Sequence, residues 1–255
     1  MQSIIYGPVS SWRLGRSLGV DIISAKNKVC SFDCIYCQLG GTIRPVVRRR
    51  EFIRLPDLAR ELESIGEIPI NYATFSGTGE PTLASNLGGA IGLVKSTLDV
   101  PVAVLTNSSL MPRDDVRKEL IQADVVVAKM DAPDEALFYQ INRPKIRYSL
   151  NEILEAIRLF RSEYRGKLAL QMMFVDANRD SAAAMAQLAR QLSPDEVQIN
   201  TPLRPCPVRP LPPDDVAAIK REFSGLGNVV TVYDAPRPVV TPLNLKETLR
   251  RRPRL

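Results

Sequence analysis

The sequence predicts an α/β protein whose main part is a partial (β/α)6 TIM-like barrel with a short C-terminal extension. Short runs rich in β-branched residues recur along the 255 residues, and amphipathic stretches separate them. Each pair covers roughly 25–40 residues, which is typical of right-handed βαβ crossovers. The runs are almost continuously apolar, as strands are when both faces of a parallel sheet are covered. Six units fall short of the eight that close a barrel, and a doubly wound open sheet is the second prediction.

The expected elements alternate from residue 20 to residue 199. We expect residues 1–200 to form the barrel and residues 201–255 to form an extension packed on it. The extension begins with six prolines between Pro202 and Pro213, so this segment is stiff and extended. Strands are expected at 20–23, 72–75, 100–105, 124–128, 168–175, 196–199 and 229–233, and helices at 55–65, 84–97, 113–122, 133–141, 150–164, 181–191 and 214–223.

The chain contains no histidine. This excludes Ser–His–Asp and Cys–His nucleophilic sites, histidine-ligated zinc and every histidine general base. Any chemistry must therefore use cysteine, carboxylates, lysine, arginine, tyrosine or a bound cofactor. Lys and Arg number 34 against 28 Asp and Glu, an excess that is compatible with an anionic partner but not diagnostic of one.

Neither a membrane span nor a secretory signal is expected. The longest stretch without a charged residue, 81–94, is too short and too rich in glycine to cross a bilayer. The first residues, MQSIIYGPVSSW, lack the basic region and apolar block of a signal peptide. We therefore expect a cytoplasmic protein, in which thiols stay reduced.

Three of the four cysteines lie within eight residues. Cys30, Cys34 and Cys37 have the spacing C-x3-C-x2-C, whereas Cys206 lies alone in the proline-rich segment. The three follow the first expected strand, so we expect a loop that can wrap its thiolates around one metal centre.

Two metal centres suit three thiolates. A structural zinc ion requires four ligands, and without histidine the fourth would be Cys206 or a carboxylate. A 4Fe–4S cluster held by three cysteines leaves one iron open for a small molecule, which makes such a cluster catalytic. The zinc hypothesis describes an RNA-binding module without catalysis, whereas the preferred cluster hypothesis describes an enzyme.

The cysteine pattern, with Tyr36 directly before the last cysteine, resembles the signature of radical S-adenosylmethionine (radical SAM) enzymes. The segment FSGTGEPT, from Phe75 to Thr82, follows the second expected strand, where this family carries a glycine-rich GGE-type motif. The resemblance covers residues 19–200. It includes LTNSSL (105–110), AKMDA (128–132) and VQINTP (197–202), which resemble the ends of the family's third, fourth and sixth strands.

The segments YGPVSSWRLGRSLGVD and CIYCQLG resemble a group of small radical SAM proteins related to the wyosine-forming tRNA enzymes, which act on a modified guanosine. Those enzymes are understood to bind a second cluster through additional N-terminal cysteines, whereas this chain has four cysteines in all. The resemblance implies one 4Fe–4S cluster, S-adenosylmethionine (SAM) and a reducing partner such as a flavodoxin or ferredoxin. The substrate stays unidentified: the resemblance favours a tRNA base or another anionic molecule, and a peptide or protein side chain or a small metabolite is the alternative.

The resemblance further implies roles for individual residues. Cys30, Cys34 and Cys37 would hold three irons, and SAM would chelate the fourth. An electron from the reduced cluster would release methionine and a 5′-deoxyadenosyl radical, which abstracts a hydrogen from the substrate. The residues assigned to SAM are Tyr36, Gly77, Thr78, Gly79, Glu80, Thr106, Asn107 and Lys129.

Physical arguments apply to the same positions. In the GTGE loop, residues 77–80, the glycines let the backbone approach a ligand, and Glu80 offers a carboxylate to the ammonium group of SAM. The alternative is a tight turn in which Glu80 is a first-turn charge at a helix start. A polar side chain on a buried strand either forms a hydrogen bond within the core or faces the space inside the barrel. We expect Asp131, Gln171 and Asn200 to face that space at the barrel mouth, as catalytic residues. Met172 and Met173 are expected to pack in the core.

Arginines gather in two segments. Between residues 44 and 54 there are five, and between 250 and 254 there are four. They could contact RNA phosphates, but aromatic residues that stack bases are scarce nearby, so solvated charged surfaces are the preferred interpretation. Arg13 and Arg16 could bind an anion or fix the first strand. Cys206 is expected to be an ordinary thiol, with a role at the site as the alternative.

Overall fold

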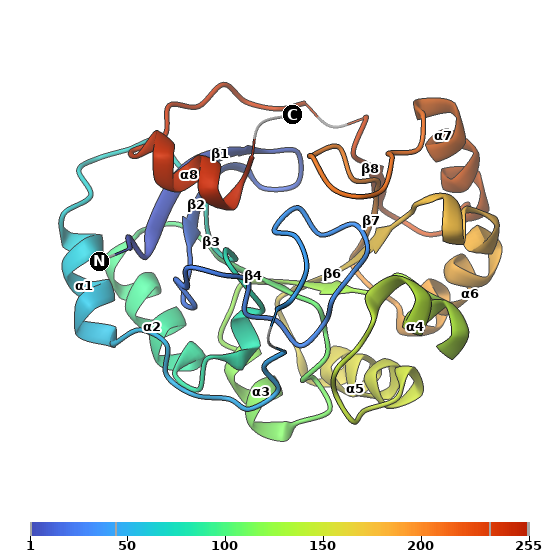
Figure 1. The fold of residues 1–255 in the computed structure, drawn as a ribbon, viewed down its shortest axis with the longest axis horizontal. Coiled ribbons are helices and arrows are strands. Elements are labelled where there is room, and N and C mark those ends of the chain that lie inside the picture. Colours follow the sequence, from blue (N-terminus) through green and yellow to red (C-terminus); the bar gives the residue numbers. More distant parts are fainter. Residues whose placement is uncertain (1, 44, 235, 254–255) are drawn as a thin grey trace.

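The computed structural model describes residues 2–43, 45–234 and 236–253. These residues form one strongly curved sheet of eight strands, with helices along its outer side (Figure 1). The strands follow one another across the sheet in chain order. All neighbouring pairs are parallel except β1 and β2, which form an antiparallel hairpin. The strands are β1 (Ile5–Ser11), β2 (Gly15–Val20), β3 (Tyr72–Phe75), β4 (Val102–Thr106), β5 (Val125–Lys129), β6 (Lys167–Met173), β7 (Glu196–Asn200) and β8 (Val229–Thr231).

Several helices begin where the sequence supplies a cap or a proline. Ser149 and Glu152 form a capping box before α5, and the side chain of Asp134 accepts a hydrogen bond at the start of α4. Proline lies in the first turn of α1 and of α7, where its missing N–H costs nothing. No helix in the described ranges is long and apolar enough to cross a membrane. The helices are α1 (Leu55–Glu63), α2 (Leu87–Thr97), α3 (Asp114–Leu120), α4 (Glu135–Asn142), α5 (Leu150–Glu163), α6 (Ala182–Leu192), α7 (Pro213–Glu222) and α8 (Leu245–Arg251).

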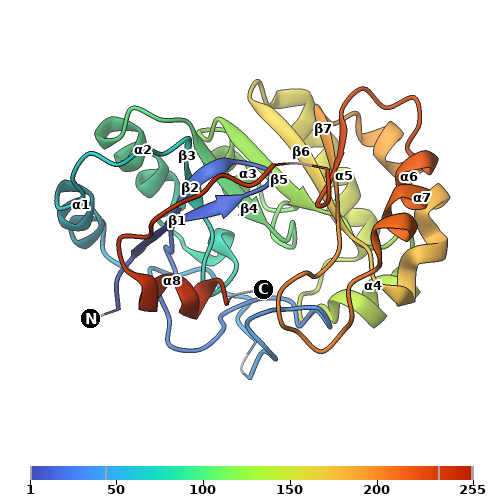
Figure 2. The ribbon, with the colours of Figure 1, turned by 90° about the horizontal axis from the view of Figure 1, so that it is seen from above.

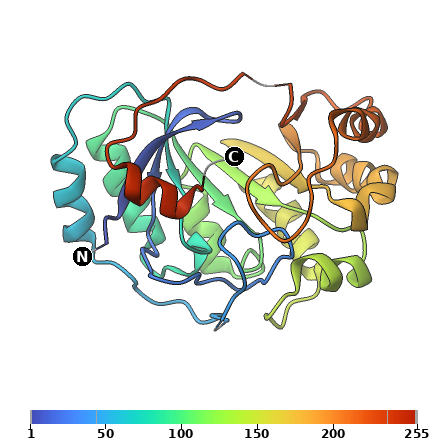
Figure 3. The same ribbon diagram turned by 45° about the horizontal axis from the view of Figure 1, so that its top comes forward.

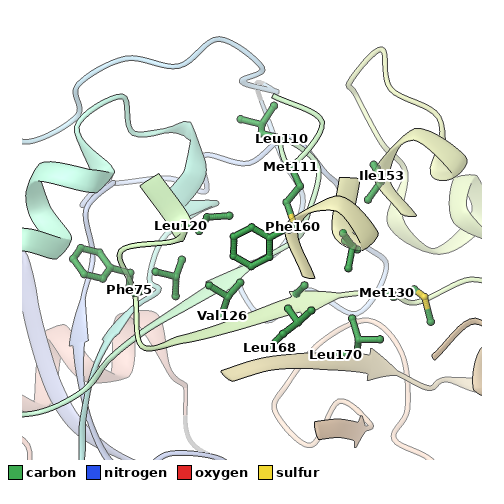
Figure 4. Packing of buried hydrophobic residues seen from close by; sticks show 14 of the residues in the cluster. Phe75, Leu110, Met111, Leu120, Val126, Met130, Ile153, Phe160, Leu168 and Leu170 are labelled. Carbon is green, nitrogen blue, oxygen red and sulfur yellow. The ribbon is translucent and has the colours of Figure 1, made fainter. Parts of the chain in front are cut away.

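The main core lies between the sheet and the outer helices. Figure 4 shows Phe160 of α5 over Val126 of β5 and Leu168 of β6, with Leu120 of α3 beside them. All four side chains are fully buried. Burying an aliphatic or aromatic side chain contributes about 1.5–3 kcal/mol, so this layer holds the helices on the sheet.

The fold confirms the predicted partial barrel, with two corrections near the N-terminus. The first parallel strand is β2, which ends at Val20, where the expected strand 20–23 begins. β1 was not predicted, because Gly7, Pro8 and the serines that follow interrupt any apolar run. It nevertheless pairs along β2 and supplies one edge of the sheet.

Residues beyond 200 reach both edges of the sheet. β8 extends the sheet in parallel beside β7. At the opposite edge α8 lies beside β1, as Figures 1 and 3 show. No helix was predicted in the basic tail, but Asn244 caps α8 by accepting a hydrogen bond from Glu247 N at 3.0 Å.

A buried ion pair joins α8 to the end of β2. Arg251 Nε donates to Asp21 Oδ2 at 2.7 Å, and the two side chains are 0% and 1% exposed. Arg251 Nη1 also donates to Glu247 Oε2 at 2.6 Å. Figure 2 shows α8 on the same side of the strands as the loop that follows β2. The C-terminal helix therefore lies at the end of the barrel where the cysteines are found.

Candidate active site

A cavity of about 310 Å³ lies inside the curve of the sheet. Its wall consists of strand ends, the loop after β2 and the segment after β7. Barrel proteins bind ligands in this position, and the volume is in the usual range for a small-molecule site. The predicted site residues that line it are Cys30, Cys34, Tyr36, Cys37, Gly77, Gly79, Glu80, Thr106, Asn107, Lys129, Gln171 and Asn200.

The cysteine loop, residues 30–41, is held by backbone contacts on two sides. Just before it, Val29 forms a parallel bridge with Gly79 of the GTGE loop. Within it, Asp33 N donates to Asn142 O at the end of α4, at 3.0 Å. These contacts bring the cysteine loop and the GTGE loop to the same cavity, although they are far apart in the sequence.

Polar hydrogens point at two of the cysteine sulfurs. Phe32 N and Asn107 Nδ2 each lie 3.4 Å from Cys30 Sγ, and Asn142 Nδ2 lies 3.4 Å from Cys34 Sγ. Burial and the neighbouring negative groups raise the pKa of Cys30 to about 12, and burial also raises the pKa of Cys34. Thiolates at these positions therefore need a cationic centre, and the donors stabilise them once it is bound.

These cysteines fit an iron–sulfur cluster better than a zinc ion. In the part of the chain that the structure describes, no three His, Cys, Asp or Glu side chains converge closely enough to hold one metal ion. A cluster instead places each thiolate on a different iron. Lys28 adds a positive charge beside the loop, since its Nζ donates to Gly40 O at 3.2 Å and its side chain is 3% exposed.

The GTGE loop requires both glycines. A Cβ on Gly79 would lie 1.8 Å from Val29 O, and one on Gly77 would lie 2.2 Å from Asp21 Cγ. Thr78 does not line the cavity, although we predicted that it contacts SAM. Its N and Oγ1 donate to the Asp21 carboxylate at 3.1 and 3.2 Å, so it fixes the loop from behind.

Glu80 is a buried carboxylate with several donors. Its Oε1 accepts from Thr82 Oγ1 at 2.8 Å and from Thr106 Oγ1 at 2.7 Å, and its Oε2 accepts from Asn107 N at 2.6 Å. Burial raises the pKa of Glu80, and these donors oppose the rise. Glu80 also caps the short 3-10 turn Pro81–Leu83, as the alternative interpretation expects. Its fixed carboxylate on the cavity wall can accept a ligand ammonium group.

Asp131 lies behind the cavity wall. Its Oδ2 accepts hydrogen bonds from Tyr36 OH and, at 2.8 Å, from Asn142 Nδ2, and its Oδ1 accepts from Met173 N at 2.8 Å. Lys129 Nζ lies 3.5 Å from Asp131 Oδ2 and 4.4 Å from the centre of the Tyr36 ring. Asp131 was predicted to be a catalytic residue, but here it positions Tyr36 and Lys129, which do line the cavity.

Successive side chains of β6 alternate between the cavity and the core. Gln171 and Met173 line the cavity, whereas Met172 is fully buried in the core. Core packing was predicted for both methionines and holds for Met172, and Met173 is also buried in a small hydrophobic cluster with Tyr36 and Ile141. Asn200 lines the same cavity from the end of β7.

The predicted solvated surface holds for most of the first basic segment, where Arg48, Arg50 and Arg54 are exposed, but not for Arg49 or for the C-terminal segment. Arg49 contacts carboxylates of α3 and is 7% exposed, and Arg251 is fully buried. Arg252 Nη2 donates to Ser76 Oγ at 2.9 Å, and Arg252 lines the cavity. Arg44 and Arg254 lie outside the described residues.

Cys206 lies outside the cavity wall. It packs beside Tyr36 and Met173, and its Sγ donates to Val208 O at 3.2 Å. This position is compatible with the ordinary thiol that the sequence predicts.

Several residues at or beside the site were not identified from the sequence, namely Asp21, Lys28, Asn142, Arg204 and Arg237. Asp21 did carry a signal, since it is a carboxylate between two apolar residues, Val20 and Ile22. A charge in such a run needs a buried partner. Nothing in the local sequence marks Asn142, at the end of α4, or Arg204, after β7.

Comparison with known proteins agrees with this geometry. Residues 26–189 match the family model of the radical SAM superfamily, and the chain belongs to this superfamily, whose enzymes use a 4Fe–4S cluster and SAM. At a finer level it groups with the UPF0026 proteins. It is 38% identical to UPF0026 protein MJ1312 of Methanocaldococcus jannaschii over 235 residues, which are 89% of this chain and 72% of that protein. It is also 38% identical to UPF0026 protein slr1464 of Synechocystis sp. over 238 residues, 92% of this chain and 84% of that protein.

Solved structures share the fold at low sequence identity. A structure of TYW1 with a lysine–pyruvate adduct bound has a TM-score of 0.64 and 15% identity, over 82% of this chain and 72% of that one. Streptococcus suis SuiB bound to S-adenosylmethionine has a TM-score of 0.63 and 12% identity, over 80% and 48% of the two chains. The curved sheet is therefore shared with proteins of very different sequence.

Proposed function

We propose that this protein cleaves SAM reductively and that the resulting radical abstracts a hydrogen atom from a substrate in the cavity. The observation that carries the proposal is that Cys30, Cys34, Cys37 and Glu80 line one cavity. A 4Fe–4S cluster held by Cys30, Cys34 and Cys37 would supply the electron that cleaves a C–S bond of SAM into methionine and a 5′-deoxyadenosyl radical.

The chain's own residues supply position and charge. The three cysteines would each bind one iron of the cluster. Glu80 would accept a hydrogen bond from the ammonium group of SAM, and Thr106 and Asn107 at the end of β4 hold the Glu80 carboxylate in place. The cofactor side of the cavity is lined by Tyr36, Lys129 and Asn107. Gln171 and Asn200 face the same space from β6 and β7 and contact the substrate. The surrounding wall limits the access of water to the radical.

Radical SAM enzymes need a reductant, and a flavodoxin or ferredoxin in the cytoplasm would supply the electron. A tRNA base is the substrate candidate that the resemblance to the wyosine-forming enzymes supports. The arginines that line the cavity support an anionic substrate more generally. Incubation of the reduced enzyme with tRNA, followed by nucleoside analysis, tests the tRNA candidate separately from SAM cleavage.

The test of the reaction is SAM turnover by anaerobically reconstituted protein. With dithionite and SAM, we expect 5′-deoxyadenosine and methionine to form together with bound iron and sulfide. A protein that contains zinc, lacks iron and forms no 5′-deoxyadenosine would instead be the zinc-stabilised RNA-binding module.

We expect Glu80→Gln to weaken SAM binding by about 10- to 100-fold, because a charge-assisted hydrogen bond contributes about 1.5–3 kcal/mol. Gln keeps an oxygen for Thr82 and Thr106 but loses the negative charge. Equilibrium binding of SAM to the reconstituted variant measures the effect, with iron content as the control. Unchanged SAM affinity would remove the assigned role of Glu80.

A further inference from the structure

Four arginines line the open side of the cavity. Arg13 comes from the turn between β1 and β2, Arg204 follows β7, and Arg237 and Arg252 belong to the C-terminal part of the chain. We call these four residues the arginine group. Figure 1 shows this turn, in dark blue, reaching from the first edge of the sheet towards the orange segments around β8. The arginine group therefore lies where the first and last strands fail to close the barrel.

The arginine group has no carboxylate partner in the described ranges. None of its members takes part in a salt bridge there. Arg13 Nε and Nη1 are shielded from solvent and have no hydrogen-bond partner among the described residues. Arg204 Nη1 has only a weak contact with the amide oxygen of Gln38, at 3.4 Å.

The carboxylate of Glu196 attracts the positive charge of Arg13, but it already accepts hydrogen bonds from other residues. Glu196 Oε2 accepts from Lys167 Nζ at 2.7 Å and from Asn228 Nδ2 at 3.0 Å, and its Oε1 accepts from Gln198 Nε2 at 2.6 Å. Glu196 therefore attracts Arg13 without forming a hydrogen bond to it.

The pKa values reflect this lack of counter-charge. Burial, followed by repulsion from Arg252 and Arg204, lowers the pKa of Arg13 to about 9. Burial and repulsion from Arg252 lower the pKa of Arg204 to about 10. Positive charges that are held together with little solvent destabilise the empty protein, and an anion between them would remove this cost.

We propose that the arginine group binds a carboxylate or phosphate group of the substrate, with Arg13 and Arg204 as the main contacts. The guanidinium fork matches the oxygens of both anions through paired N–H···O bonds. This inference rests on the proposed function, because the anion belongs to the molecule that the radical attacks. Anchoring one end of the substrate in this way leaves its other end free to face the SAM side of the cavity.

The carboxylate of SAM is the alternative occupant, and chain direction argues against it. Arg13 lies at the amino end of β2, before Gly15. The cysteine loop and the GTGE loop follow the carboxyl ends of β2 and β3, at the opposite end of these strands. SAM held by those loops therefore leaves Arg13 to another anion. Arg204 and Arg252 lie nearer to SAM, since Arg204 follows the carboxyl end of β7 and Arg252 Nη2 donates to Ser76 Oγ beside the GTGE loop, so the competition experiment below decides for them.

The test is a calorimetric titration of the full-length reconstituted protein with inorganic phosphate and, separately, with malonate, at constant ionic strength. We expect saturable 1:1 binding of at least one anion. We expect Arg13→Gln and Arg204→Gln each to weaken it by at least about tenfold, as the loss of a charge-assisted hydrogen bond implies. Tighter binding of phosphate or of malonate indicates which group the substrate carries.

Two matched controls lie in the same segments. Arg16 and Arg209 are exposed and do not line the cavity, so Arg16→Gln and Arg209→Gln should change the affinity less than twofold. Without added anion, Arg13→Gln should melt at the wild-type temperature or above it, because it removes an unpaired charge. A purely structural arginine would instead lose stability on substitution.

Several results would overturn the proposal. These are no saturable binding of either anion, equal loss of binding in the control variants, a markedly lower melting temperature for Arg13→Gln, or competition between the anion and SAM for one site. The titration does not require SAM cleavage. Failure of anion binding in a protein that cleaves SAM would therefore reject this inference alone, and the reverse result would reject the proposed reaction.

Discussion

Substitution of Cys34 by alanine is expected to reduce 5′-deoxyadenosine formation to the background level and to abolish the visible iron–sulfur absorbance. The reason is that Cys34 is one of three thiols on the cavity wall, and two thiolates hold a cluster too weakly to keep it. Iron and sulfide analysis of the anaerobically reconstituted variant, together with chromatography of the products, measures both effects.

Cys206→Ala is the matched control for this experiment. Cys206 donates to Val208 O and does not line the cavity, so its loss should leave the iron content and SAM cleavage unchanged. If Cys34→Ala still cleaves SAM, the assignment of the cysteine loop is wrong. If Cys206→Ala loses the cluster, Cys206 is itself a cluster ligand, and the assignment of the cluster to the cysteine loop alone is wrong.

Arg251→Met is expected to lower the free energy of unfolding by about 3–5 kcal/mol, the cost of leaving a buried charge without its partner. Asp21 is 1% exposed, so water cannot replace the lost guanidinium. The same carboxylate accepts hydrogen bonds from Thr78, and we therefore expect the GTGE loop to lose order. Urea denaturation gives the stability, and hydrogen exchange at Thr78 N reports on the loop.

The double variant Asp21→Asn/Arg251→Met separates the charge from the packing of α8. The asparagine side chain keeps an oxygen for Thr78 and carries no charge, so the double variant should recover part of the stability that Arg251→Met loses. Arg165→Met, at an exposed position, is the control and should change the stability by less than about 0.5 kcal/mol. Equal stability of Arg251→Met and the wild type would show that the pair contributes nothing.

The sequence predicted the parts of the fold that depend on local pattern. The strands from β3 to β7 are largely apolar, buried runs, and amphipathic stretches separate them, so each was visible within its own segment. β1 and α8 were not visible, because β1 lacks a continuous apolar run and α8 depends on a contact with a distant segment. β1 pairs with β2 through an irregular register, and α8 depends on Asp21, which precedes Arg251 by 230 residues.

The candidate site also contains residues that the sequence predicts and residues that it does not. The cysteines, Gly79 and Glu80 belong to short motifs whose chemistry can be read from residue type and spacing. The different positions of Thr78 and Asp131 could not be predicted, because both lie in the right segments but point at buried partners. The same limit applies to Arg204 and Arg252, which reach the cavity only after the sheet has curved.

The contact between Asp21 and Arg251 also has a consequence for the order of folding. Every strand pairs with its neighbour in the chain, so each strand pairing closes a much shorter loop than a contact between the two ends of the chain does. The Asp21–Arg251 contact spans almost the whole chain and forms only when the C-terminal segment has returned from β8 to the first edge of the sheet, beside β1. The GTGE loop, which Asp21 holds, is therefore expected to be among the last parts of the barrel to become rigid during refolding. The protein would thus complete its binding site for SAM only after the rest of its sheet is in place.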